Sequence, residues 1–121
     1  MWIFMPDAFV SISEHAEEPR LLVIRARIAG DIEKVFPEAQ VVETPNEDYR
    51  FRTSIARERV AHVMANRVQH INYHSVSGSI EDPDRWTTYV SVLAAMQEEQ
   101  QRRIDRTLEL EPKISRHDLD A

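Results

Sequence analysis

Residues 21–28 read LLVIRARI and residues 49–55 read YRFRTSI, and each run carries two arginines that lie two positions apart. Successive side chains of a β-strand point to opposite faces, whereas a helix does not set residues two apart side by side. The spacing therefore predicts two strands that carry all of these arginines on one surface of a sheet. The functional surface is expected to contain Arg25, Arg27, Arg50 and Arg52.

The opposite face of both runs is apolar, which predicts that it supports the hydrophobic core. By the same alternation, Tyr49 and Phe51 fall on the core face, away from the arginines. The core expected from this alternation and from the helical spacing of other apolar positions contains Leu22, Ile24, Phe51, Ile55, Val35, Phe36, Val63 and Met64.

The composition limits the classes of protein to which the chain could belong. A chain of 121 residues is expected to form one domain with its own core. It contains no cysteine, which excludes disulfides, thiol catalysis and cysteine–zinc sites. The 21 acidic and 15 basic residues give a net charge of −6, which disfavours non-specific binding to nucleic acid. Without a signal peptide or an apolar run of ~20 residues, the protein is expected to be cytoplasmic and free of membrane contact.

Hydrophobic periodicity and turn residues predict the order of the elements. Alternation predicts a hairpin of strands at 2–4 and 9–14. Asp82, Pro83 and Asp84 supply an N-cap, a proline suited to the first helical position and an acid in the first turn, so a helix is expected to begin there. The remaining expected elements are a strand at 21–28, a short helix ending at Phe36, strands at 41–44 and 49–55, a helix at 57–70 and a strand within 71–80.

This order predicts the fold class α+β. Between residues 21 and 80 the elements follow the order βαββαβ of a ferredoxin-like core, in which two helices cover one face of a four-stranded antiparallel sheet. The N-terminal β-hairpin and a long C-terminal helix at about 83–110 are expected as additions to this core. We expect residues 1–111 to form a single α+β domain and residues 112–121 to form a flexible tail.

Five motifs carry a resemblance to a known family. They are MWIF at residues 1–4, VIRAR at 23–27, TPNEDYRFR at 44–52, INY at 71–73 and VLAAMQ at 92–97. On these motifs the chain resembles a small, functionally uncharacterised family of bacterial and phage proteins with a ferredoxin-like core. The resemblance implies no activity and no site residues.

The loop after the first arginine run carries a resemblance to the ACT regulatory domains. Gly30 lies in the stretch Ile28-Ala29-Gly30-Asp31-Ile32, where ACT domains have a glycine that usually follows a proline; here Ala29 stands in place of the proline. The resemblance implies that a small ligand such as an amino acid binds near this loop.

Side chains capable of catalysis or metal binding are present, but their spacing does not bring them together. His62 and His70 are eight positions apart and His74 follows the expected helix end, so the three are not expected to converge on a metal. Adjacent residues of a strand point apart, so His74 is not expected to act as a base for Ser75. We therefore expect no enzymatic activity, no metal site and no cofactor.

Three interpretations of the arginine surface remain open. As a protein interface, it would pair its arginines with acidic residues of a partner. As an RNA-binding platform, it would lack the central aromatic residues that stack on bases. As a structural feature, it would pair its arginines with Glu14, Glu17 or Glu43, or lie under the C-terminal helix.

We expect a non-enzymatic protein that binds a macromolecule, as an inhibitory or accessory factor, through the arginine surface and the C-terminal helix. The expected partner is another protein or a second copy in a homodimer. The reason is that the helix from Pro83 passes through a polar stretch before apolar residues return at Ile104 and Leu108. The alternatives are an ACT-like domain that senses a small ligand and an RNA-binding module.

Overall fold

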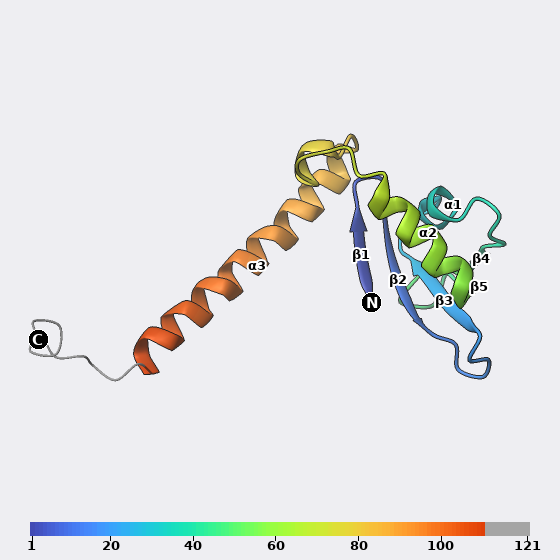
Figure 1. Ribbon diagram of the computed structural model, residues 1–121, viewed down its shortest axis with the longest axis horizontal. Helices are drawn as coiled ribbons and strands as arrows, with labels where there is room; N and C mark the ends of the chain where they lie inside the picture. Colours follow the sequence, from blue (N-terminus) through green and yellow to red (C-terminus); the bar gives the residue numbers. More distant parts are fainter. Residues whose placement is uncertain (111–121) are drawn as a thin grey trace, which may run out of the picture.

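The computed structural model describes residues 1–110, which form one antiparallel sheet and three α-helices, one of them projecting far from the sheet (Figure 1). The predicted α+β class is therefore confirmed. The sheet has the order β1-β2-β3-β5-β4. Its strands are β1 (Trp2–Met5), β2 (Ala8–Glu14), β3 (Leu21–Ala26), β4 (Val42–Glu43) and β5 (Phe51–Ala56). The helices are α1 (Asp31–Val35), α2 (Arg57–Gln69) and α3 (Pro83–Leu110), and Ser77–Ser79 form a 3₁₀ turn.

One face of the sheet carries the hydrophobic core. The register of β2, β3 and β5 sets Ile12 beside Ile24, and Ile24 beside Thr53. α1 and α2 cover this face, and the largest fully buried side chain is that of Phe36, which follows α1. The expected core is confirmed, because Ile24, Val35, Phe36 and Val63 are buried, and Leu22, Phe51, Ile55 and Met64 pack against the buried cluster.

The strand expected within 71–80 is wrong. These residues form a loop that contains the 3₁₀ turn and is held by local hydrogen bonds. The Ser75 hydroxyl accepts the N–H of Gly78 at 3.1 Å, and the Ser79 hydroxyl donates to the Ser75 carbonyl at 2.9 Å. Serine side chains that bond to nearby backbone compete with strand pairing. The βαββαβ order is therefore not completed, and β2 of the hairpin occupies the position beside β3.

The other expected elements agree with the structure in type and order, although β3 ends at Ala26 and β5 begins at Phe51. The hairpin is formed by β1 and β2, and the long helix has the expected bounds. Asp82 caps α3, because its Oδ1 accepts the N–H groups of Asp84 and Arg85 at 2.9 and 3.3 Å. The flexible tail expected at 112–121 lies outside the described residues. No helix within residues 1–110 is long and apolar enough to cross a membrane.

α3 leaves the sheet soon after it begins (Figure 1). It has 28 residues, and at a rise of 1.5 Å per residue it is about 42 Å long. Its first turns, as far as Val92, line a groove against the sheet. From Ser91 to Leu110 every residue except Glu99 is exposed. Most of the helix therefore extends beyond the domain that anchors it.

Candidate functional site

A groove of about 450 Å³ lies between the open face of the sheet and the first turns of α3. Trp2 and Phe4 alternate with the core residues of β1, and Phe9 lies opposite Phe4 across the hairpin, so all three point away from the core. Tyr89 of α3 meets the ring of Phe4 edge-on, with 5.3 Å between the ring centroids. We name this site the aromatic groove. Its aromatic and aliphatic lining is formed by Trp2, Phe4, Phe9, Ile28, Tyr49, Tyr89 and Val92.

A buried ion pair fixes α3 to the sheet beside this groove. Arg85 donates to both carboxylate oxygens of Asp31, at 2.6 and 3.0 Å, and Asp31 also accepts the N–H of Phe9 at 3.0 Å. The Tyr89 hydroxyl accepts from Arg85 at 3.3 Å and donates to the Ala8 carbonyl at 3.0 Å. Asp31 has no exposed surface and Arg85 is 9% exposed. Charges withdrawn from water to this degree must be paired, so the geometry of the groove depends on this contact.

Arg85 and Tyr89 are the two residues of α3 in this network, and their surroundings keep each of them in a single protonation state. Burial alone would lower the pKa of Arg85, but its hydrogen bonds to Asp31 and Tyr89 and the charge of Asp31 raise the pKa above its usual range. Burial raises the pKa of the Tyr89 hydroxyl, although Arg85 opposes the shift. Arg85 therefore stays charged and Tyr89 stays neutral at physiological pH. Neither group is suited to proton transfer there, which makes the network structural.

Two of the four predicted arginines are brought together. Arg25 of β3 and Arg52 of β5 are direct cross-strand partners on the open face. Arg25 donates to the Ser13 hydroxyl at 2.7 Å, and Arg52 forms an ion pair with Glu47 at 2.6 Å. Like charges opposite each other on a sheet repel, so these polar partners offset the repulsion. In the described part of the chain, Nε of Arg52 is the one buried side-chain nitrogen or oxygen without a hydrogen-bond partner.

Arg27 lies apart from this pair and belongs to the aromatic groove. It pairs with Asp48 at 2.9 Å, and its guanidinium lies over the ring of Tyr49, 4.1 Å from the centroid. The hydrogen bond from Arg27 lowers the pKa of Asp48. The expectation that Tyr49 lies on the core face is wrong. Tyr49 precedes the first residue of β5, so strand alternation does not extend to it.

Arg50 also lies outside the strands. It pairs with Glu43 at 2.8 Å, which is one of the internal pairs that the sequence left open. No ion pair within residues 1–110 includes Glu14 or Glu17, the other two acids considered. These two acids and Arg25 line a separate hollow of about 430 Å³. The four arginines are thus divided among different local environments.

Removing two arginines at once tests whether they stabilise the fold. The double substitution Arg25→Ala and Arg50→Ala is expected to leave the melting temperature nearly unchanged. Loss of the exposed Arg50–Glu43 pair contributes little, and loss of Arg25 relieves its repulsion with Arg52. Thermal unfolding followed by circular dichroism measures the effect. A protein that fails to fold would assign the arginines a structural role.

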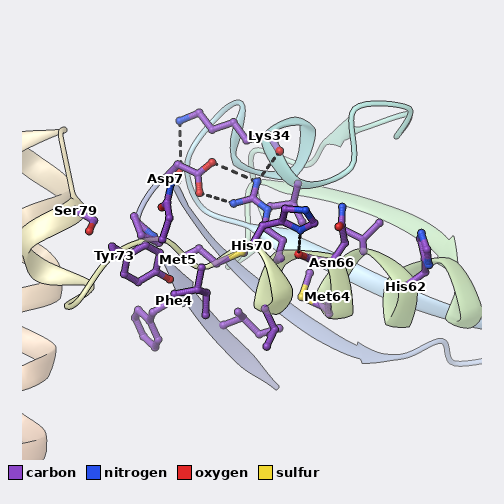
Figure 2. A pocket seen from close by; sticks show the side chains of 18 of the residues that line it. Phe4, Met5, Asp7, Lys34, His62, Met64, Asn66, His70, Tyr73 and Ser79 are labelled. Carbon is purple, nitrogen blue, oxygen red and sulfur yellow. Dashed lines mark hydrogen bonds and ion pairs between the residues drawn. The ribbon is translucent and has the colours of Figure 1, made fainter.

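A second hollow, of about 780 Å³, lies along α2 and the loop that follows it (Figure 2). Several of its polar groups are engaged with one another or with the backbone. Arg67 donates to both carboxylate oxygens of Asp7, at 2.8 and 3.3 Å, and to the Lys34 carbonyl at 2.8 Å. Nδ1 of His70 lies 2.8 Å from the Asn66 carbonyl. Partial burial alone would raise the pKa of Asp7, but Arg67 outweighs it and lowers the pKa.

The histidines do not assemble around this hollow. His62 lies within α2, His70 follows its last residue (Figure 2), and His74 lies in the loop beyond the helix. No group of three or more metal-binding side chains gathers within residues 1–110. The hollow therefore offers no arrangement of metal ligands or of nucleophile and base.

The projecting part of α3 carries an apolar stripe. Leu93 and Met96 are 50% and 58% exposed, although both are large apolar side chains. Two glutamines interrupt the stripe before it continues towards the end of the helix. We name this surface the α3 stripe; along its centre it contains Leu93, Met96, Gln97, Gln100, Ile104, Thr107 and Leu108. Glu99 and Arg103 lie on one flank of it.

Comparison with known proteins assigns no role to these surfaces. No protein-family model, curated protein or solved structure matches the chain. The resemblances to the bacterial and phage family and to ACT domains therefore stay expectations. Gly30, the position that carries the ACT resemblance, lines neither the aromatic groove nor the hollow along α2.

The aromatic groove is not predicted from the sequence, for two different reasons. The rule that located the arginines also puts Trp2 and Phe4 on the open face, once β1 is placed beside β2. That part of the groove could have been predicted. The ion pair between Asp31 and Arg85 joins residues 54 positions apart, and no local pattern marks either residue.

Proposed function

We propose that the protein is a non-enzymatic binding protein whose main surface is the aromatic groove, and that its partner there is a polypeptide. The observation that carries the proposal is the clustering of aromatic side chains in one groove. A volume of about 450 Å³ accommodates one or two side chains of a partner. Trp2 is 68% exposed at its rim, and tryptophan and tyrosine are the residues that most often dominate binding energy at protein interfaces.

Charge indicates which polypeptide fits the groove. The two arginines that line it are engaged, Arg27 with Asp48 and Arg85 with Asp31. The two acids that line it are Asp82 and Asp84. Within residues 1–110 neither of them forms an ion pair. The charges in the groove that no ion pair within residues 1–110 neutralises are therefore negative. A segment with an aromatic or leucine anchor beside lysine or arginine would complement it.

The same charges argue against the RNA-binding alternative. The open face does carry aromatic residues that could stack on bases, since Trp2, Phe4 and Phe9 all point there. A nucleotide bound to them would bring its phosphates close to Asp82 and Asp84. The arginines of the sheet centre line a different hollow. A protein partner is thus better supported than a nucleic acid.

Selection from a phage-displayed peptide library on the immobilised full chain tests the groove. Selected peptides are expected to combine an apolar anchor with lysine or arginine. Trp2→Ala should weaken their binding about 30-fold, the loss typical of a tryptophan that anchors a partner. Trp86→Ala is the matched control, because Trp86 is exposed on α3 outside the groove and should leave binding unchanged.

Two outcomes of this selection would contradict the proposal. One is a set of acidic peptides, since these would point to the arginines rather than to Asp82 and Asp84. The other is an equal loss of binding in the Trp2→Ala and Trp86→Ala variants. Circular dichroism of both variants verifies that they remain folded.

Self-association through α3 is a second function, which the α3 stripe favours. A helix that exposes Leu93, Met96, Ile104 and Leu108 on one side has an apolar face without a covering element among the described residues. Covering such a face is the usual driving force for helix pairing. The expected homodimer therefore stays part of the proposal, with α3 as its interface.

A further inference from the structure

The α3 stripe is arranged almost symmetrically about Gln100. Met96 and Ile104 lie four positions on either side of it, and Leu93 and Thr107 lie seven positions on either side. A two-fold dimer uses the same patch on both subunits, so a contact from one position to a second must be matched by the reverse contact. The spacing of this stripe meets that requirement for helices that run in opposite directions.

We infer that a second copy of this chain covers the stripe, with the two α3 helices antiparallel and Gln100 on the two-fold axis. The inference rests on the proposed role of α3 in self-association and names its partner and geometry. In this arrangement Met96 lies at the level of Ile104 of the second copy, and Leu93 lies at the level of Thr107. Leu93, Met96 and Ile104 of one helix thus each meet the stripe of the other.

The charged flank of the stripe is complementary in the same arrangement. Glu99 and Arg103 form an ion pair within one helix, at 2.9 Å. A two-fold axis perpendicular to the helices brings the same flank of both copies together. Glu99 then lies at the level of position 101 of the second copy, about 3 Å along the axis from the level of Arg103. The four charges form an alternating network instead of a repulsive one.

The polar residue at the centre also fits this arrangement. An amide side chain contains both donors and an acceptor, so Gln100 can hydrogen-bond to its own symmetry copy on the axis. A polar residue within an otherwise apolar helix seam costs stability but specifies register and orientation. Only the register centred on Gln100 sets this side chain against its own copy; in the register shifted by three residues, Gln100 faces Gln97 and Leu93 faces Ile104.

The arrangement makes the second copy part of the aromatic groove. Val92 lies eight positions before Gln100 and lines the groove, and Leu108 lies eight positions after it. The end of the second helix at Leu110, which is 78% exposed in one copy, therefore reaches the mouth of the groove. A dimer has two such grooves, one at each end of the helix pair.

Mass and crosslinking test the inference on the full chain, whose lack of cysteine makes single-cysteine variants unambiguous. Light scattering at micromolar concentration is expected to give twice the monomer mass of 14.1 kDa. Under oxidation, Leu93→Cys mixed with Thr107→Cys should form a mixed disulfide. Each variant alone should not, because two copies of either position lie about 21 Å apart along the axis, beyond the reach of a disulfide.

A substitution in the stripe tests whether this surface carries the association. Ile104→Gln should raise the dissociation constant about 100-fold, because each copy loses one buried apolar side chain. Arg102→Gln, on the opposite side of the same helix, is the control and should leave the constant unchanged.

Three results would overturn the inference: a mass of 14.1 kDa, a disulfide formed by Thr107→Cys alone, or equal effects of the Ile104 and Arg102 substitutions. A disulfide formed by Thr107→Cys alone would mean that the helices are parallel. A monomer whose peptide binding still depends on Trp2 would overturn the antiparallel pair and leave the proposed role of the aromatic groove intact.

Discussion

Arg85→Met is expected to lower the free energy of unfolding by about 3–5 kcal/mol, the loss typical of a broken buried ion pair. The substitution removes both Arg85 hydrogen bonds from the carboxylate of Asp31, which has no exposed surface, and leaves only the longer contact with Lys34 at 3.9 Å as an ion pair. The remaining hydrogen bond from the N–H of Phe9 compensates for only part of this loss. Urea denaturation at one fixed protein concentration measures the effect, because association changes the apparent stability.

Two further variants identify the cause of this loss. Arg59→Met removes an ion pair of similar length, but Arg59 and its partner Glu38 are both exposed, so stability should stay almost unchanged. Asp31→Leu combined with Arg85→Met should recover much of the loss, because an apolar pair avoids the cost of burying an uncompensated charge. A double variant that is less stable than Arg85→Met alone would show that Asp31 has another essential role.

Phe36→Ala is expected to cost a similar amount, about 3–5 kcal/mol, for a different reason. Phe36 is the largest fully buried side chain, and its removal leaves a cavity between α1 and the sheet in addition to the lost burial of apolar surface. Phe4→Ala is the matched control in the aromatic groove, where the ring is 36% exposed. The same urea denaturation should give a clearly smaller loss for Phe4, whereas peptide binding should fall only for Phe4. Equal losses of stability would mean that the groove is part of the core.

The sequence predicts the core face of the sheet more completely than the open face. The core face followed from alternation, since Leu22, Ile24 and Phe51 lie in continuous strands and each neighbour simply points the other way. Alternation does not predict the side on which Tyr49 lies, because this residue precedes the start of β5. A period of two holds only while the backbone is extended.

The helices show the same dependence on local signals. Asp82 and Pro83 marked the start of α3 because capping involves residues that are neighbours in the chain. The scattered apolar residues of segment 71–80 favour a strand, but the local hydrogen bonds of Ser75 hold the segment as a loop. Neither the pairing of β2 with β3 nor the contact of Asp31 with Arg85 has a local signal, because both depend on how distant segments pack.

The projecting part of α3 and the sheet differ in how often their structure opens. Beyond Val92 the helix is exposed and makes no buried contact with the described residues of its own sheet. Most helical stability in proteins comes from tertiary packing, so we expect this region to open more often than the sheet. Chain that opens in this way is the first target of proteases. In the proposed dimer the second copy covers α3, so we expect proteases to cleave the monomer faster than the dimer.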